Sequence, residues 1–397
     1  MRFVVVLALY QRCLSRLDRQ CEGLSPWDKQ ETDSCAFFVE YFHPTELFII
    51  AESEESIGKK NYQTEMKTNF LLSLLVLVLF GTRVMAQSSL LATLNHEGTI
   101  TTFYGAMALQ KAHAAAENGD VITLSSGTFL SVDITKAVTL RGAGMVLDAA
   151  TQTEPTVLAN DFKITIADDV TGRLTIEGVY SNQRVSIEKL KNAMFLKDRI
   201  NVIKIPSTGY GKDLTFIHCR IAEQYSGNDN SNNSATFQNC IVSYITGYNY
   251  IFHNSIIRGG SANSGIYLCY YSEYKNCIIT NYLYNDAPGT SKFYNNIFIG
   301  TDASRLNSIP NSTNVFVNRE DDKIKNLRGY SDDNDFKLTD EAKAIMKGSD
   351  GTEVGLYGGS LPYDPTPTNP QISKFNVAAK TTADGKLSVD IEVKSAE

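Results

Sequence analysis

The sequence predicts an all-β fold, a single-stranded parallel β-helix solenoid, from three observations between residues 213 and 300. Five heptads in this region can be aligned with one another: Thr215–Ile221, Thr236–Val242, Ile251–Ile257, Glu273–Ile279 and Lys292–Phe298. Each has an aromatic second residue, and four of the five have Asn at the fourth position. Their starts are 21, 15, 22 and 19 residues apart. A period of about 20 is typical of solenoids, because one repeat alone cannot bury its apolar side.

The order of residues within the heptad predicts two short strands that meet at a corner. The aromatic second and small fifth residues are placed to point inward, whereas the third and sixth point outward. Asn at the fourth position tolerates the left-handed backbone of a corner better than most residues do. Coils stacked ~4.8 Å apart would bring equivalent Asn amides within hydrogen-bonding reach of one another. The 15-residue step before Ile251 is short for a complete coil, so the register is least constrained there.

The chain before Gln87 is unlike the repeats and contains a predicted secretory signal. Residues 1–65 contain no heptad, and we expect them to be an extension from a wrongly assigned start, with translation beginning at Met66. Residues 66–86 combine a basic start, the apolar run Phe70–Phe80 and the small residues Val84 and Ala86, which are the features of a signal peptide. The apolar run is too short to span a bilayer, so no transmembrane segment is expected after signal removal. These features predict a secreted, periplasmic or cell-surface protein.

The mature chain is expected to divide into a solenoid and a short tail. Residues 87–361 are assigned to the β-helix, which begins with a capping helix within residues 104–118 that Gly119 ends. Without a cap, the first coil would expose its strand edges and its apolar core. Residues 362–370 contain four prolines and predict an extended linker. Residues 371–397 alternate apolar and polar positions around Asp384 and Gly385, which predicts a C-terminal β-hairpin tail.

Charge and cysteine content exclude several classes of protein. The chain has 37 basic and 44 acidic residues, a net charge of −7, and no Arg-rich run, which argues against a nucleic-acid partner. The cysteines lack the CxxC spacing of zinc sites, and no metal site is predicted. Cys219 and Cys240 share the inward fifth position, where small side chains fit, so we expect reduced, buried thiols rather than a disulfide. The other two cysteines after the signal are Cys269 and Cys277.

Two segments that flank the heptads resemble a known group of proteins. Residues 119–144 (GDVITLSSGTFLSVDITKAVTLRGAG) look like the opening coils, and residues 335–359 (DFKLTDEAKAIMKGSDGTEVGLYGG) look like the last coil, of right-handed parallel β-helix proteins of the pectin-lyase-like group. The resemblance extends over about residues 95–360 and is strongest to secreted proteins of Bacteroidetes. It implies a right-handed solenoid. It leaves the activity open, because one fold supports many functions.

The resemblance supplies no catalytic residue. Lyases of this group pair a Ca²⁺ site with an Arg or Lys base, and hydrolases use two or three Asp residues at a corner. No residue of this chain matches either pattern, so catalytic residues are not assigned and no cofactor is expected, with Ca²⁺ entering only for a lyase.

The outward positions of the heptads form two ladders of different character. The sixth positions give an apolar ladder that something must cover, with the loop of residues 225–233, the Pro-rich segment and the tail as candidates. The third positions mix amide, imidazole, ammonium and phenol groups, as expected of a ligand-facing side. With two aromatic and basic neighbours, the residues predicted to bind substrate are Gln238, His253, Arg258, Tyr271, Lys275 and Tyr294.

Tyrosines are concentrated near the third and fourth heptads. Their exposed members would suit stacking against sugar rings, whereas the alternative is that they are β-forming residues of a sheet surface. Tyr274 is expected in the core, and of the neighbours Tyr270 and Tyr271 one at least should be exposed. The concentrated tyrosines are Tyr244, Tyr248, Tyr250, Tyr267, Tyr270, Tyr271, Tyr274, Tyr282 and Tyr284.

Three functions are compatible with these features. The first is a secreted or surface protein that binds a polysaccharide or cell-surface glycan, or is adhesin-like, without catalysis. Lys275 and Arg258 would favour an acidic sugar. The alternatives are a polysaccharide lyase or glycoside hydrolase, and a structural surface protein.

The signal pattern predicts the N-terminus of the exported protein. We expect N-terminal sequencing of the secreted form to begin at or near Gln87, because cleavage should follow Ala86. Detection of residues 1–65 on the exported protein would contradict both the signal and the proposed start.

Overall fold

The computed structural model describes most of the chain after residue 89. The described ranges are 90–149, 151–226, 233–258, 269–280, 291–300, 313–317, 336–345, 347–366, 371–378, 380–382 and 384–394. Contacts divide the chain into Met1–Met85 and Ala86–Glu397, and every described residue belongs to the second unit. The predicted extension 1–65 and signal peptide 66–86 therefore lie outside the described residues.

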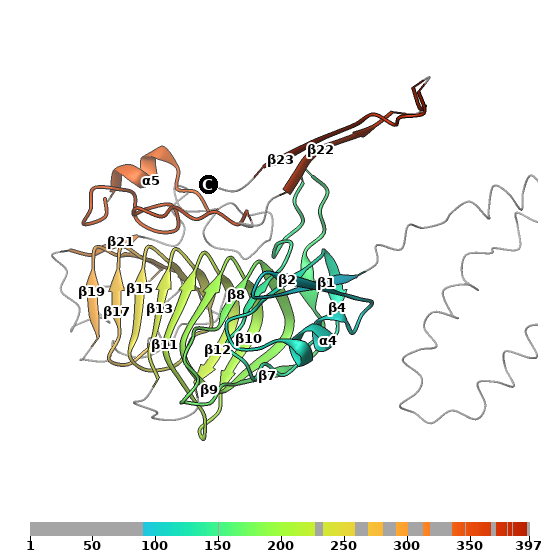
Figure 1. Cartoon of the computed structure of the whole chain (residues 1–397). Helices are drawn as coiled ribbons and strands as arrows, with labels where there is room; N and C mark the ends of the chain where they lie inside the picture. Colours follow the sequence, from blue (N-terminus) through green and yellow to red (C-terminus); the bar gives the residue numbers. More distant parts are fainter. Residues whose placement is uncertain are drawn as a thin grey trace, which may run out of the picture. The chain divides into compact units, whose positions relative to one another are not determined.

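The predicted fold class is confirmed: the chain forms a parallel β-solenoid of about seven turns (Figure 1). Each coil contributes a strand before the corner and a strand after it, so the coils build two stacks. The pre-corner stack contains β3 (Val121–Leu124), β5 (Thr139–Arg141), β8 (Thr175–Glu177), the end of β9 (Val179–Leu196), β11 (Tyr210–Ile217), β13 (Ala235–Gln238), β15 (Tyr250–His253), β17 (Glu273–Lys275) and β19 (Lys292–Tyr294). The post-corner stack contains β4 (Gly127–Phe129), β6 (Thr156–Leu158), the start of β9, β10 (Arg199–Ile205), β12 (Arg220–Ser226), β14 (Ile241–Ser243), β16 (Ile256–Arg258), β18 (Ile278–Thr280), β20 (Ile297–Ile299) and β21 (Val315–Val317). β7 (Phe162–Thr165) pairs with the middle of β9.

The predicted register of the five heptads is confirmed throughout. Thr215 pairs with Thr236, Thr236 with Ile251, Ile251 with Glu273, and Glu273 with Lys292, all in parallel. The 15-residue step before Ile251 is therefore a full coil. A further repeat that the sequence alignment missed precedes them, because Met194 pairs with Thr215 and Phe195 with Phe216.

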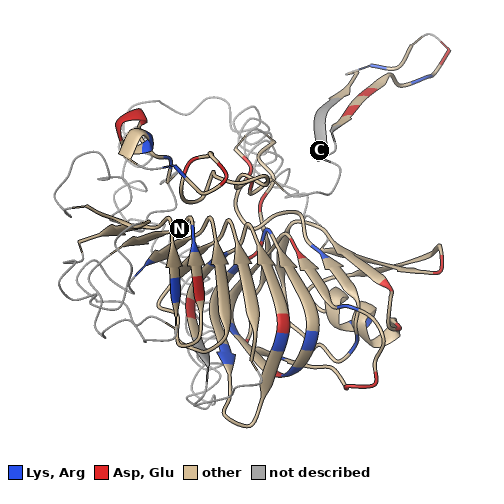
Figure 2. Cartoon of the chain, turned by 90° about the vertical axis from the view of Figure 1, so that its left-hand side faces the viewer, with Lys and Arg blue, Asp and Glu red and all other residues tan. Residues whose placement is uncertain are grey.

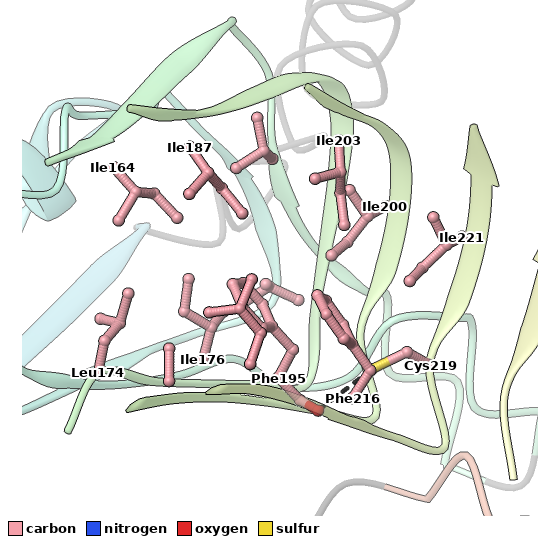
Figure 3. Packing of buried hydrophobic residues seen from close by; sticks show 14 of the residues in the cluster. Ile164, Leu174, Ile176, Ile187, Phe195, Ile200, Ile203, Phe216, Cys219 and Ile221 are labelled. Atoms are coloured by element: carbon pink, nitrogen blue, oxygen red, sulfur yellow. Dashed lines mark hydrogen bonds between the residues drawn. The ribbon is translucent and has the colours of Figure 1, made fainter. Parts of the chain in front are cut away.

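An aromatic ladder fills the interior behind the pre-corner stack. The second-position rings of successive coils stack with centroids 4.7–4.9 Å apart and nearly parallel planes. Figure 3 shows Phe195 and Phe216 among the aliphatic side chains that point into the core from the surrounding strands. The ladder consists of Phe195, Phe216, Phe237, Phe252, Tyr274 and Phe293.

The inward fifth position carries small polar or thiol groups that hydrogen-bond along the stack. The Cys219 amide donates to Cys240 Sγ (3.4 Å), the Cys240 amide to Ser255 Oγ (3.1 Å), and the Cys277 amide to Asn296 Oδ1 (2.8 Å). All four described cysteines are free and buried, which confirms the prediction of reduced thiols. Burial raises the pKa of the Cys277 thiol to about 12.

In the missed repeat the fifth position is an aspartate. Asp198 is fully buried, and its Oδ1 accepts a hydrogen bond from the Val179 amide (2.9 Å). Burial raises the pKa of the carboxyl well above its usual range, with the nearby Cys219 and Glu177 acting in the same direction. Burial therefore favours the neutral form of the Asp198 carboxyl.

The N-terminal end is closed by a hairpin and a helix. β1 (Leu91–His96) and β2 (Thr99–Tyr104) form an antiparallel hairpin, and β1 also pairs antiparallel with β3. The predicted capping helix is α4 (Ala108–Ala115), and its face of small residues is buried against the first coil. The sequence did not reveal the hairpin, because β2 is exposed and lacks a buried alternating pattern.

The apolar ladder of sixth positions is covered, but by an unexpected segment. Residues 336–366, here called the cover and described without residue 346, contain α5 (Asp340–Ile345) and lie along the post-corner stack (Figure 1). Cover residues Phe336, Leu338 and Leu356 belong to one buried cluster with the ladder, which comprises Ile241, Ile256, Ile278 and Ile297. The stretch that resembles a last coil thus packs across the outer side of the other coils and contributes no strand to the described solenoid. Of the candidate covers, the Pro-rich segment takes part through Tyr363, whereas residues 227–232 of the candidate loop lie outside the described residues.

The tail forms the predicted hairpin, and the described surface mixes both signs of charge. β22 (Gln371–Val377) and β23 (Val389–Lys394) pair antiparallel, and Val389, Ile391 and Val393 are exposed. Basic and acidic residues are interspersed along the coils (Figure 2). No helix among the described residues is long and apolar enough to cross a membrane.

Burial of the apolar ladder predicts that the cover stabilises the solenoid. Ile278→Ala should lower the free energy of unfolding by about 2–5 kcal/mol, because it removes a fully buried side chain shared with the cover. Ile251→Ala is the matched control, since Ile251 is 39% exposed on the other outward face and should cost far less. Equal losses in denaturant melts of the two variants would contradict this account.

The raised pKa of Asp198 predicts that its contribution to the free energy of unfolding falls with rising pH. A raised carboxyl pKa gives a contribution that is complete below the unfolded pKa of about 3.9 and is lost as pH rises through the folded value. Asp198→Asn should therefore melt close to the parent near pH 4 and above it at pH 7–8.

Asp168→Asn is a control for which the effect on stability should depend on pH in the opposite direction. Hydrogen bonds from Lys189, Tyr210 and Lys191 hold the Asp168 pKa well below its usual range, so its contribution is present at neutral pH and lost on acidification. The window for Asp168 lies below its unfolded pKa of about 3.9, so melting curves are compared at pH 2 and pH 8. If the two variants differ from the parent with the same pH dependence, the assignment is contradicted.

Candidate functional site

Every corner of the central coils is a residue in the left-handed region. The corner residues have φ between 48° and 66°, a conformation that Gly and Asn adopt more readily than other residues. Four are the predicted Asn residues, the missed repeat adds a lysine, and the coil before it adds a glycine. The corners are Gly178, Lys197, His218, Asn239, Asn254, Asn276 and Asn295.

The corner side chains fasten the cover to the solenoid. Asn239 Nδ2 donates to the carbonyls of Leu356 (2.9 Å) and Gly358 (2.8 Å), and Asn276 Oδ1 accepts from the Ser349 amide (3.0 Å). The sequence predicted amide hydrogen bonds along the stack, but these corner amides bond to the cover, and the fifth position bonds along the stack instead.

The two corners nearer the N-terminus are also tied to the cover. His218 Nε2 contacts the Leu361 carbonyl at 3.1 Å, and burial lowers the His218 pKa. Lys197 Nζ donates to Asp364 Oδ2 (3.0 Å) and to the Thr366 carbonyl (2.6 Å). The cover is thus held at four corners by three kinds of side chain, lysine, histidine and asparagine.

A polar pocket of about 180 Å³ lies where the cover meets the third-position ladder. Two further pockets are smaller, about 80 Å³ beside Arg199 and Arg220 and about 30 Å³ beside Asp168. The larger pocket, called here the corner pocket, is lined from the coils by Gln238, His253, Asn254, Lys275 and Asn276, and from the cover by Ser349, Asp350, Gly359 and Ser360.

The corner pocket combines one cation, one carboxylate and several amides and hydroxyls. A hydrogen bond from the Thr352 hydroxyl (2.7 Å) lowers the pKa of Asp350, and the charge of Lys275 acts in the same direction. The carboxylate is therefore ionised at neutral pH beside the ammonium group. Such a site offers both donors and acceptors, as the hydroxyls of a polar ligand require.

Two nitrogen atoms at the corner pocket have no hydrogen-bond partner among the described residues. Asn254 is 7% exposed, yet its Nδ2 is unpaired, and His253 Nε2 is unpaired as well. The nearest acid to that imidazole is Glu273, whose Oε1 lies 3.7 Å away, beyond hydrogen-bonding distance. Because buried polar atoms are nearly always paired, these two nitrogens are unsatisfied polar groups of residues that line the pocket.

The structure brings together three of the six residues predicted to bind substrate. Gln238, His253 and Lys275 line the corner pocket, and Tyr294 lies on the next coil in register with Lys275. Arg258 is placed elsewhere: it is buried on the post-corner stack, with its guanidinium 5.7 Å from the ring centroid of cover residue Phe336. Arg258 follows Ile256 and Ile257 in an alternating strand, so it shares the outward side of Ile256.

Tyr271 precedes β17 in a turn of left-handed backbone (φ 52°), within a group of three tyrosines. The rings of Tyr248 and Tyr270 stack at 5.2 Å, and those of Tyr248 and Tyr271 lie 6.3 Å apart at 28°. Tyr270 is 44% exposed and Tyr271 61% exposed, whereas Tyr274 is buried as predicted. We call Tyr248, Tyr270 and Tyr271 the tyrosine platform. The predicted Tyr267, Tyr282 and Tyr284 lie outside the described residues.

The pocket residues that sequence reasoning missed are the corner amides and the cover. The sequence assigned Asn254 and Asn276 a corner backbone and amide hydrogen bonds along the stack, but no place in a pocket. The cover residues carry no repeat and come 73 to 169 residues after the corner residues that they contact. The uncovered apolar ladder was the one signal that some segment must lie there.

Comparisons of the chain with protein-family models, with curated proteins and with solved structures find no match in any of the three.

Proposed function

We propose that this protein is a secreted or cell-surface β-helix that binds an acidic glycan at the corner pocket without cleaving it. The proposal includes membership of the right-handed, pectin-lyase-like group of Bacteroidetes proteins, which rests on the sequence resemblance. The observation that carries the binding proposal is the pair of unpaired nitrogens, Asn254 Nδ2 and His253 Nε2, beside the ammonium group of Lys275.

The chemistry of the corner pocket fits a sugar that carries a carboxylate. Lys275 and the unpaired Asn254 amide supply a positive charge and a donor for carboxylate oxygens, and charge-assisted hydrogen bonds of this kind are among the stronger ones. Asp350 and the Gln238 side chain supply acceptors for sugar hydroxyls. The pocket is smaller than the ~300–1,000 Å³ sites of drug-sized ligands, so it accommodates one sugar unit of a longer chain.

Binding is favoured over turnover by the way in which the pocket is built. Four of its nine lining residues come from the cover. The position of the cover is fixed by hydrogen bonds to the corners and by burial of Leu356. Polysaccharide lyase or hydrolase activity remains the alternative, and it is tested by incubating the mature protein with acidic polysaccharides and measuring unsaturated products and reducing ends.

The central role of Lys275 predicts a loss of affinity on its removal. Lys275→Ala should weaken binding of an acidic glycan about 10- to 100-fold, because a hydrogen bond to a charged group contributes about 1.5–3 kcal/mol. Dissociation constants of a glucuronate-containing oligosaccharide, measured by calorimetry, provide the readout.

Lys292→Ala is the matched control for the change in net charge. Lys292 is an exposed lysine on the next coil and does not line the corner pocket. Comparable losses in the two variants would indicate non-specific charge attraction, and binding unchanged by Lys275→Ala would place the glycan elsewhere.

A further inference from the structure

We infer that the pocket beside Arg199 and Arg220, here called the arginine pocket, is a separate site that binds a sulfate group. The inference goes beyond the proposed glycan binding and does not depend on it, because the arginine pocket lies on the post-corner stack and shares no lining residue with the corner pocket. Its volume of about 80 Å³ is less than half that of the corner pocket, so it suits a single oxyanion group rather than a sugar unit.

Strand register places the two arginines on neighbouring coils. Arg199 pairs with Arg220 where β10 runs parallel to β12, and both stand at the outward sixth position. Neighbouring coils are ~4.8 Å apart, so the two side chains leave the backbone one strand spacing from each other. Like charges on directly opposite residues repel, and an anion that contacts both guanidinium groups offsets this repulsion.

Each guanidinium group is oriented by a tyrosine. The Arg199 guanidinium lies 4.5 Å from the ring centroid of Tyr180, its partner on the preceding coil. Arg220 is 9% exposed, and its Nε donates to the hydroxyl of cover residue Tyr363 (2.8 Å). Burial raises the pKa of Tyr363, so this hydroxyl is neutral and does not cancel the charge of Arg220. A guanidinium group has five N–H donors, so one such contact orients it without exhausting its capacity to bind an anion.

The lining of the arginine pocket carries positive charge only. Its seven residues, all within the described part of the chain, include the two arginines and Asn201 but no Asp or Glu. Of the acidic residues next to the arginines in sequence, Asp198 is buried in the core and Glu223 lies outside the lining. The lining residue Ala222 is exposed, so solvent reaches the pocket. Because the whole chain has a net charge of −7, an anion is held here by local contacts rather than by long-range attraction.

Two arginines on adjacent coils fit a tetrahedral oxyanion better than a carboxylate. A planar carboxylate pairs best with a single guanidinium group, through two parallel hydrogen bonds. The oxygens of a sulfate group point in several directions, so they accept hydrogen bonds from both guanidinium groups at once. Sulfate occurs both as the free ion and as an ester on a sugar, and both sources present this group.

The test titrates the mature protein with inorganic sulfate at constant ionic strength, with calorimetry as the readout. The parent should bind sulfate saturably. Arg199→Ala should weaken this binding about 10- to 100-fold, because it removes a hydrogen bond to a charged group. Arg199→Lys should restore only part of the affinity, because lysine keeps the charge and lacks the planar fork. Arg199 is changed rather than Arg220 because Arg220 is buried against the cover.

Arg184→Ala is the matched control for the loss of one arginine. Arg184 is exposed on β9 beside Asp161 and does not line the arginine pocket, so this variant should bind sulfate as the parent does. No saturable binding by the parent, or an unchanged affinity of Arg199→Ala, would overturn the site. Equal losses in Arg199→Ala and Arg184→Ala would also overturn it, because they would indicate non-specific charge attraction.

Two further measurements separate this site from the corner pocket and identify the source of the sulfate group. Lys275→Ala should leave sulfate binding unchanged, and a loss would place sulfate in the corner pocket and overturn the inference. Failure of the glycan proposal would appear instead in the titrations with the glucuronate-containing oligosaccharide. N-acetylglucosamine 6-sulfate replaces the free ion in the second measurement: tighter binding that Arg199→Ala weakens supports a sulfated sugar as ligand, and weaker binding supports the free ion.

Discussion

The left-handed corner is the constraint on which both the coil and its cover depend. Each coil must turn at one residue, and that residue must adopt a positive φ that costs about 1–3 kcal/mol for most side chains. Asn lowers this cost, and its amide remains free to bond outward. At Lys197 and His218 the backbone is strained without that advantage, but their side chains are bound to Asp364 and to the Leu361 carbonyl. The same residues therefore shape the coil and hold the segment that buries its outer apolar ladder.

Most of the solenoid could be predicted because the residue pattern that specifies each coil is short and recurs along the chain. The aromatic second position and the Asn fourth position recur in each heptad, so alignment alone gave the register that the strand pairing confirms, even across the 15-residue step. The residues around Phe195 were expected to form a further coil but were not aligned with the heptads, because lysine and aspartate stand where later coils have Asn and Cys. Its aromatic residue stacks 4.7 Å from Phe216 all the same, which shows that ring stacking tolerates a change at the corner.

The site was only partly predictable, because half of it comes from a distant segment. Gln238, His253 and Lys275 share a ladder position, and the alternation of a strand was enough to place them on one outward side. Ser349, Asp350 and Ser360 reach them through tertiary contacts that no short-range pattern encodes. Arg258 lies apart from them because the chain turns at the Asn254 corner, so His253 on β15 and Arg258 on β16 face different sides. The covered ladder shows that an unexplained apolar strip can identify a missing contact but not its partner.

The direction of the cover sets a limit on how the solenoid can change its length. Going forward along the cover, residues 349, 356–358, 361 and 364 contact the corners at Asn276, Asn239, His218 and Lys197 in turn, so the cover runs backward along the stack. Neighbouring coils are ~4.8 Å apart, and the cover contacts follow the order of the coils, with the coil of Asn254 between those of Asn276 and Asn239. Insertion or loss of a whole coil between Lys197 and Asn276 would leave the stacked aromatic rings intact. It would nevertheless displace every later contact between the cover and a corner residue by one coil. The cover thus restricts the number of coils along its own length. Coils can be added to or removed from the ends of the molecule during evolution, while the number between Lys197 and Asn276 is fixed.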